Sequence, residues 1–416
     1  MVSLGATWKA LMSLTLSLLV LHVEAAMVVK IPHYRRDLSH VDISSFMDAK
    51  SQVHGNEGEA HGAPNVPDGA QFITLPVGDK GDKIPVYWSA TPNNPKVEHA
   101  FVMMHGRLRD GDHYWTVMNN VLNSARKANY KGAMKESIVV APQMYSEKLN
   151  KGQYDDMTLA WDDVNAWESG AIATHPYGTN MTSMDALDAI VDHFSNTTAF
   201  PSMKNITMIG HGGGAQLINR YAATAKDPQS PKIYIRYVVG DPSSSPYFTE
   251  HRPVTDTSIA SIDKCDGYNT WRYGFDNYTG TLDSKLMPKD YFGRYLRRDV
   301  VNIIGLDDTK PNGDQKCMAL LQGGSRRRNR NLSWWRYINM LARTNETLTG
   351  FPGNFTDLPD WSDEWVDRIG TRLAIVEDAT HNAAEVFEGK IGRSALFDDY
   401  SVETGWRPSE QWLRKQ

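Results

Sequence analysis

Residues 205–225 read NITMIGHGGGAQLINRYAATA, and this stretch decides the fold. Its first part, Asn205–Ile209, is a short apolar run that predicts a buried strand. The segment Gly210-His211-Gly212-Gly213-Gly214 then predicts a sharp turn, because glycine adopts the backbone conformations that tight turns need. Residues 215–225 are expected to form a helix. A strand that turns directly into a helix is the repeating unit of a parallel sheet with crossover helices.

Other apolar runs repeat this unit along the chain. Further strands are expected at Phe72–Pro76, Ile84–Ser89, Ala100–Met104, Ile138–Ala141, Tyr234–Val239, Val300–Ile304 and Thr371–Val376. A helix is expected at Met184–Phe194, because Thr182 and Asp185 form a capping-box pattern before a one-sided apolar face. The alternation predicts an α/β fold with a mostly parallel sheet.

A strand–turn–helix with the pattern G-x-S-x-G is the nucleophile elbow of serine hydrolases, whose acid and histidine follow in that order. Here the pattern holds except that Gly212 stands in the serine position. Asp307 and Asp308 follow the strand at 300–304, and His381 follows the strand at 371–376. The order of a catalytic triad is therefore kept without its nucleophile.

From about residue 70 onward the chain resembles secreted microbial α/β-hydrolases whose elbow reads G-H-S-A-G-G-Q. The resemblance implies the α/β-hydrolase fold. It places His381 in the base position, Asp308 or Asp307 in the acid position, and Gly212 at the nucleophile. It implies that the amides of Gly213 and of Gly106 or Arg107 form an oxyanion hole, which would still bind a carbonyl or phenolate oxygen.

Glycine in the nucleophile position predicts that the chain is not a hydrolase. Loss of a triad serine costs about a millionfold in turnover and leaves roughly 10³ to 10⁴ over water. Glycine also adopts the strained elbow conformation without penalty. The alternative is an active secreted esterase or lipase-like hydrolase that uses a non-standard nucleophile, with Ser243, Ser244 and Ser245 the nearest candidates.

The segment 246–298 is rich in aromatic residues and is expected to form a cap inserted over the carboxyl edge of the sheet, where α/β folds bind ligands. Trp271 and Tyr273 are expected to stack on a flat ligand, the alternative being aromatic packing in a satellite core. The aromatic residues are Tyr247, Phe248, Tyr268, Trp271, Tyr273, Phe275, Tyr278, Tyr291, Phe292 and Tyr295.

With its elbow glycine, the chain resembles more narrowly the fungal hydrolase-like auxiliaries that lack the serine and accompany laccases in making bis-naphthopyrones such as viriditoxin. This resemblance implies a non-catalytic protein that directs the stereo- and regioselectivity of phenol coupling in mycotoxin biosynthesis. It implies a phenolic polyketide ligand, a secreted laccase as partner and no cofactor.

The start of the chain has the order of a secretory signal peptide. Lys9 precedes an apolar run from Ala10 to Leu21, and Val23-Glu24-Ala25 supplies small residues for cleavage. We expect residues 1–26 to be the signal peptide, 27–70 an extended lead-in, and 71–416 the α/β domain. The protein is therefore expected to be secreted, without a membrane anchor.

Two further features are typical of a secreted protein. Cys265 and Cys317 are the only cysteines, and such a pair in an oxidising compartment predicts one disulfide, with two buried thiols as the alternative. Seven glycosylation sequons agree with secretion. They start at Asn180, Asn196, Asn205, Asn277, Asn331, Asn345 and Asn354.

The charge pattern excludes some partners. With 44 Lys and Arg against 49 Asp and Glu, the net charge is −5, so neither a nucleic-acid partner nor a polybasic membrane anchor is expected. The basic run Ser325–Arg330 is expected to be a solvated loop. Asp110, Asp112 and His113 are also expected to form a polar loop, and no metal site is expected.

Overall fold

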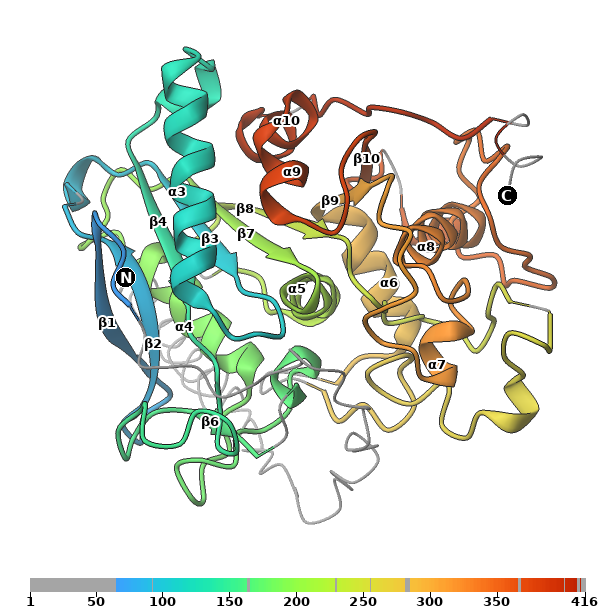
Figure 1. Ribbon diagram of the computed structural model, residues 1–416, viewed down its shortest axis with the longest axis horizontal. Coiled ribbons are helices and arrows are strands. Elements are labelled where there is room, and N and C mark those ends of the chain that lie inside the picture. The colour runs from blue at the N-terminus through green and yellow to red at the C-terminus, as the bar shows by residue number, and fades with distance from the viewer. Residues whose placement is uncertain are drawn as a thin grey trace, which may run out of the picture. The chain divides into compact units, whose positions relative to one another are not determined.

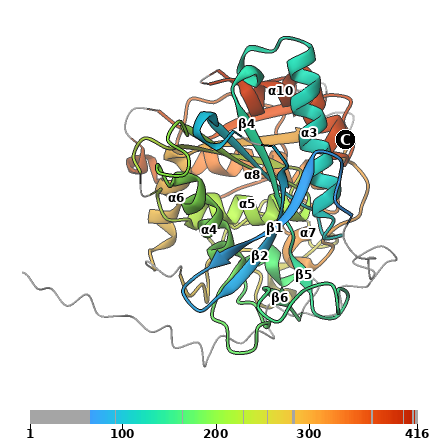
Figure 2. The same cartoon turned by 90° about the vertical axis from the view of Figure 1, so that its left-hand side faces the viewer.

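A mixed sheet of eight strands forms the centre of the computed structural model (Figure 1). Its strands are β1 (Ala70–Val77), β2 (Asp82–Ser89), β3 (His99–Met104), β4 (Ser137–Pro142), β7 (Asn205–His211), β8 (Tyr234–Gly240), β9 (Asp299–Gly305) and β10 (Arg372–Val376). The spatial order is β1-β2-β4-β3-β7-β8-β9-β10. Strands β1 and β2 are antiparallel, β2 pairs antiparallel with β4, and all later neighbours are parallel. Figure 2 shows β1 and β2 at the near edge. All eight predicted strands are confirmed.

The structure describes residues 65–416 except 92, 163–164, 229, 255, 281–284, 366–367, 400, 410–411 and 413–416. The chain divides into two units, 1–41 and 42–416, and every described residue belongs to the second. The predicted signal peptide and most of the predicted lead-in therefore lie outside the described residues. None of the described helices is both long and apolar enough to cross a bilayer.

Helices cover both faces of the sheet (Figure 1). They are α3 (Gly111–Lys127), α4 (Ser183–Ser195), α5 (Gly213–Thr224), α6 (Pro288–Arg297), α7 (Cys317–Leu320), α8 (Arg327–Leu341), α9 (Ala383–Glu388) and α10 (Lys390–Phe397). Residues of α3, α9 and α10 share one buried cluster on one face, and residues of α4, α5, α6 and α8 share the other. A small parallel pair, β5 (Tyr145–Ser146) and β6 (Ala160–Trp161), forms a second sheet.

Strand β3 illustrates how the sequence sets the two layers. Val102 and Met104 pack into the cluster with α4 and α5, whereas Phe101 and Met103 pack into the cluster with α3. Side chains alternate across a strand, so a strand buried on both faces is apolar throughout. The predicted helix at 184–194 is α4, and its capping box is confirmed because Thr182 and Asp185 exchange side-chain and backbone hydrogen bonds.

The aromatic segment is part of the core. Phe248 stacks on Phe275 at 5.3 Å and on Trp334 of α8 at 5.8 Å. The end of the predicted insertion, residues 288–297, is the crossover helix α6, which packs against α5. Most of these rings belong to the same buried cluster as residues of α5, α6 and α8, so the segment extends the hydrophobic core, in agreement with the alternative prediction of aromatic packing.

Two polar segments differ from expectation. The basic run leads into α8, and Arg327, Arg328 and Arg330 are buried, so the prediction of a solvated loop is wrong. Asp112 and His113 lie in the first turn of α3 rather than in a loop. Each buried guanidinium finds acceptors inside the protein, which makes burial of the charge tolerable.

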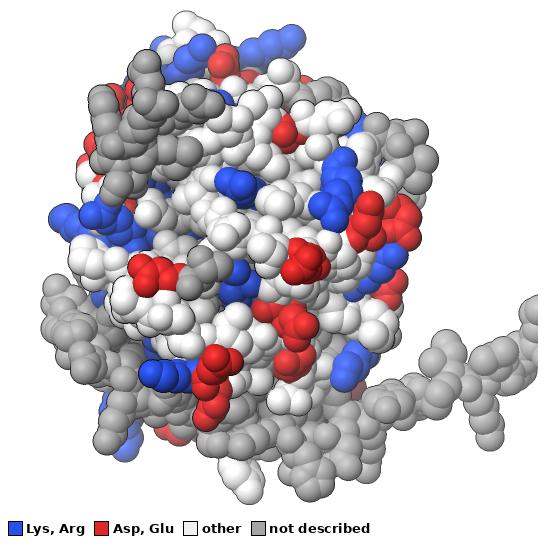
Figure 3. Space-filling view, turned by 90° about the vertical axis from the view of Figure 1, so that its right-hand side faces the viewer, with Lys and Arg blue, Asp and Glu red and all other residues white. Residues whose placement is uncertain are grey.

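The disulfide between Cys265 and Cys317 is confirmed. Of the seven sequon asparagines, Asn331 is buried within α8. A glycan at Asn331 would prevent α8 from packing, so the prediction at this position is wrong. Figure 3 shows acidic and basic side chains interspersed over the face that it draws, as the mixed composition led us to expect.

Candidate active site

The turn between β7 and α5 has the geometry of a nucleophile elbow. Gly212 has φ 57° and ψ −115°, a conformation that L side chains rarely adopt and that glycine takes without strain. Its N–H donates to the carbonyl of Gly240 at 2.9 Å, and its carbonyl accepts from Gln216 N–H at 3.1 Å. The elbow is therefore held on both sides although it carries no side chain.

The predicted base and acid meet at the elbow. His381, after β10, donates from Nδ1 to Oδ2 of Asp308 at 2.9 Å. Asp308, after β9, is buried, whereas Asp307 is exposed, so Asp308 is the carboxylate that orients the histidine. A Cβ placed on Gly212 would lie 3.0 Å from His381 Nε2. The imidazole thus takes up space that a side chain at position 212 would need.

Arg327 makes this pair unlike a working triad. Its Nε and Nη2 donate to the two oxygens of Asp308 at 2.8 and 3.0 Å. Burial opposes ionisation of Asp308, but the hydrogen bonds from His381 and Arg327 outweigh it and lower its pKa to about 2. Because the guanidinium already neutralises the carboxylate, Asp308 stabilises an imidazolium less than a lone aspartate does.

His381 is accordingly a weak base. Desolvation of the ring, the neighbouring His211 and Arg327 lower its pKa to about 4 against the attraction of Asp308. Its side chain is 32% exposed, so the site opens to solvent here. At neutral pH the imidazole is uncharged, with Nε2 directed at Gly212.

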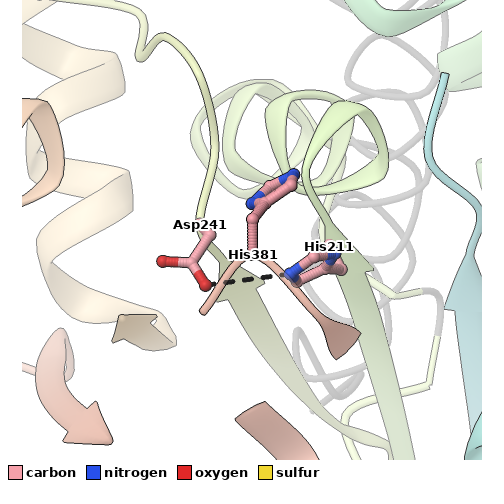
Figure 4. Close-up of side chains that lie close together, drawn as sticks. All are labelled: His211, Asp241 and His381. Atoms are coloured by element: carbon pink, nitrogen blue, oxygen red, sulfur yellow. Dashed lines mark ion pairs between the residues drawn. The ribbon is translucent and has the colours of Figure 1, made fainter. Parts of the chain in front are cut away.

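Beneath the elbow lies the group His211, Asp241 and His381 (Figure 4). One potential ligand atom from each lies within 4.8 Å of the others, and among the described residues no other such group occurs. The imidazole rings of His211 and His381 are tilted against each other, with centroids 4.4 Å apart and 32° between their planes. Ring planes only 32° apart direct their in-plane lone pairs along similar directions rather than toward one ion, and Nδ1 of His381 is already bonded to Asp308. This arrangement does not favour a metal.

His211 and Asp241 are instead a neutral buried pair. His211 Nε2 lies 3.7 Å from Asp241 Oδ2, too long for a hydrogen bond. Burial lowers the pKa of His211 to about 4. Burial and the nearby charge of Asp308 raise the pKa of Asp241 to about 8. Neither group is charged at neutral pH, and Asp241 accepts the N–H of Gly305 at 3.0 Å.

A carboxylate lies next to Gly213, one of the residues expected to form the oxyanion hole. A Cβ on Gly213 would lie 3.1 Å from the amide nitrogen of Arg107, so these two backbones meet as expected. The same Cβ would lie 2.3 Å from Oε1 of Glu168. Glu168, in the short 3₁₀ turn Ala166–Ser169, is buried, and Gln216 Nε2 donates to its Oε2 at 2.9 Å.

Neither Glu168 nor Arg327 was found from the sequence. Glu168 belongs to no motif. The sequence feature that could have pointed to it is Gly213, which stands where the elbows of the resembling hydrolases have alanine. Gly106 lies beside Tyr114, whose hydroxyl would be 2.9 Å from a Cβ at 106.

The predicted stacking residues do not line the site. Trp271 is 5% exposed and packs on Tyr278 with ring centroids 4.2 Å apart. Its Nε1 donates to the carbonyl of Ser169 at 2.7 Å. Tyr273 is 4% exposed, and its hydroxyl donates to Asp314 at 2.6 Å. The expectation that these rings present a face to a ligand is wrong, because both side chains are buried and both polar tips are hydrogen-bonded inside the protein.

The raised pKa of Asp241 predicts how the free energy of unfolding depends on pH. Its pKa of about 8 in the folded protein exceeds the ordinary 3.8, and Glu168 rises to about 7 from 4.5. Folded carboxyls with raised pKa values stabilise at low pH and lose that contribution as pH rises through the folded value. His211 and His381, whose pKa values are both lowered to about 4, oppose this fall only between about pH 4 and 6.5. We expect urea-unfolding free energies to fall between pH 6.5 and 8, with a shallower fall in Asp241→Asn. The exposed control Asp307→Asn should keep the wild-type slope, and an equal slope in all three proteins would contradict the assignment.

Comparisons with known proteins agree with the fold. No protein-family model and no curated protein matches the chain. Among solved structures, the poly(3-hydroxybutyrate) depolymerase LpqC from Bordetella parapertussis superposes with a TM-score of 0.51 and 16% identity, covering 79% of this chain and 89% of its own. Poly(aspartic acid) hydrolase-1 from Sphingomonas sp. KT-1 has a TM-score of 0.49 and 16% identity, with coverages of 78% and 96%. The siderophore hydrolase EstA from Aspergillus nidulans has a TM-score of 0.42 and 11% identity, with coverages of 82% and 99%. The strand order and the overlap with the depolymerase show that the chain has the α/β-hydrolase fold.

Proposed function

We propose that this protein binds a ligand on an α/β-hydrolase scaffold without hydrolysing it. One observation carries the proposal: Nε2 of His381 lies 3.0 Å from the position that a Cβ on Gly212 would take. The acid–base pair is aligned on a residue that has no side chain to activate. Nucleophilic catalysis needs the nucleophile within hydrogen-bond reach of its base, and glycine offers none.

The alternative, an esterase with another nucleophile, is not favoured by the neighbouring serines. Ser244 donates to Gln216 Oε1 at 2.6 Å and accepts from Arg220 at 3.0 Å. The Ser245 hydroxyl accepts from Asn219 at 3.0 Å. Ser243, Ser244 and Ser245 are all buried. These contacts are those of a structural polar network and include no imidazole.

We further propose that the protein is a secreted auxiliary that binds phenolic polyketide monomers and directs their coupling by a partner laccase. The resemblance to serine-less fungal auxiliaries supports this, and the signal-peptide pattern and the disulfide support secretion. Laccase-generated radicals couple in free solution without axial preference, and a tenfold bias needs only about 1.4 kcal/mol. With Trp271 and Tyr273 in the core, we assign ligand contact to the open edge of the site at His381.

The test is a coupling reaction with and without the protein. A laccase oxidises a phenolic precursor whose dimer has a chiral axis, and chiral chromatography measures the enantiomeric ratio. We expect a ratio near one without the protein and a bias of about tenfold with it at saturation. Heat-denatured protein is the control. An unchanged ratio across several precursors, with the protein's own partner laccase included, would remove the coupling role.

A further inference from the structure

The carboxylate of Glu168 lies beside Gly213, one of the residues whose amides were expected to form an oxyanion hole. Its Oε1 would be 2.3 Å from a Cβ on Gly213, which is closer than side-chain atoms approach. With any other residue at position 213, the carboxylate would have to move away from this place. Gly212 removes the nucleophile, and Gly213 leaves room for an acidic group. Both glycines therefore change the site from one that cleaves an ester to one that can bind a ligand without cleaving it.

Glu168 is fixed by its neighbours on one side. Gln216 Nε2 donates to Oε2 at 2.9 Å, and the Gln216 carbonyl oxygen accepts from Ser244. Arg220 donates to the backbone carbonyl of Glu168 at 3.1 Å. Within the described part of the chain no hydrogen bond ends on Oε1, the oxygen beside Gly213. A rigid carboxylate thus keeps one acceptor oxygen for another partner.

The charges around Glu168 narrow the choice of that partner. Arg272, Arg220 and Arg107 all act to lower its pKa, and Asp314 acts to raise it. Three guanidinium groups against one further carboxylate disfavour a cationic ligand. Ionised Glu168 has no proton to donate, so a carbonyl oxygen would bring its lone pairs against those of Oε1, and an oxyanion would add a repelling charge. A neutral group with an O–H donor carries no positive charge and offers a proton, rather than lone pairs, to Oε1.

We propose that Glu168 is the ligand-recognition residue of this site and that it binds ligands through an acidic hydroxyl group, a phenol or an enol, that donates to Oε1. The inference deepens the proposed function, on which it rests, by naming the group that is recognised. It replaces the expectation that the amides of Gly213 and Gly106 hold a carbonyl oxygen. Burial raises the pKa of Glu168 to about 7, so the accepting, ionised form prevails in mildly alkaline solution.

Two probes that differ in one hydroxyl test this assignment. Isothermal titration calorimetry at pH 8 compares 2-naphthol with 2-methoxynaphthalene, which has the same ring system but no donor. A hydrogen bond to a charged group makes us expect about tenfold tighter binding of the naphthol. The preference should shrink as pH falls from 8 to 6, because a protonated Glu168 can donate to the ether.

Three variants separate recognition from folding. Glu168→Gln keeps the size of the side chain but replaces one acceptor oxygen by an NH2 group. Because Gln216 Nε2 donates on the other side, the NH2 should face the ligand, and most of the tenfold preference should be lost. Gly213→Ala should lose it as well, since its methyl group displaces Oε1. Glu388→Gln, at an exposed glutamate on α9, should keep it. Circular dichroism checks that each variant is folded.

The possible binding results test the role of Glu168, the choice of a neutral donor and the coupling role separately. Equal affinity of wild type for both probes at pH 8, or an unchanged preference in folded Glu168→Gln, would overturn the role of Glu168 and leave non-hydrolytic binding intact. Tighter binding of 1-naphthylmethylamine than of the naphthol would overturn the choice of a neutral donor. If neither 2-naphthol nor 2-methoxynaphthalene binds, both the role of Glu168 and the binding of aromatic ligands are overturned. A tenfold naphthol preference together with an unchanged enantiomeric ratio would remove the coupling role alone.

Discussion

The purified protein is expected not to hydrolyse p-nitrophenyl esters, and a fluorophosphonate probe is expected to label none of its serines. The reason is the missing hydroxyl at Gly212, whose loss in a triad costs about a millionfold in turnover. Any residual rate would come from binding alone. Mass spectrometry of the probe-treated protein checks this, with an active serine esterase as positive control. Stoichiometric labelling at Ser243, Ser244 or Ser245 would instead establish the alternative nucleophile.

The same geometry sets what Gly212→Ser can recover. The added Cβ would meet His381 Nε2 at 3.0 Å, so the imidazole must shift by a few tenths of an ångström. Arg327 neutralises Asp308 and the pKa of His381 is about 4, so the base is weak. We expect hydrolysis above that of the wild type but far below a millionfold gain, and a further rise in Gly212→Ser/Arg327→Met. A fully active single variant would contradict the role given to Arg327.

The sheet and the elbow could be predicted from the sequence because local patterns determine them. A buried parallel strand is an apolar run, and a strand ending in several glycines allows few turns. All eight strands and the placement of His381 against Asp308 follow from these patterns and from chain order. Helices α3, α6, α7, α8, α9 and α10 were not predicted. In α8 the reason is evident, because its buried positions include three arginines, which a pattern of apolar residues does not register.

What the sequence did not reveal depends on contacts across long separations. Arg327 reaches Asp308 only because α8 begins beneath the end of β9, and charge runs are usually solvated. Glu168 reaches Gly213 from a turn that no motif marks. The aromatic segment shows the same limit: composition identifies a cluster of rings but does not say whether their faces meet one another or a ligand. Burial decides that, and burial is a property of the packed chain.

Because Trp271 packs in the core rather than against a ligand, we expect its removal to lower the stability of the protein strongly. The indole is 5% exposed, contacts the rings of Tyr278 and Phe275, and donates to the carbonyl of Ser169. Removing such a side chain loses its transfer free energy and leaves a cavity, so Trp271→Ala should lower the free energy of unfolding by about 3–5 kcal/mol. Urea unfolding followed by circular dichroism measures the change.

The control is Tyr177→Ala, at an aromatic residue that is fully exposed and should change stability by less than about 0.5 kcal/mol. A ligand platform predicts the opposite pattern for Trp271, namely little loss of stability and a large loss of naphthol affinity, because an exposed ring is not held by the core. Trp271 also braces Ser169, the neighbour of Glu168, so some loss of affinity should accompany the loss of stability. If Trp271→Ala lost naphthol affinity but kept the wild-type free energy of unfolding, Trp271 would be a ligand-binding residue. That result would show that the aromatic segment opens in solution.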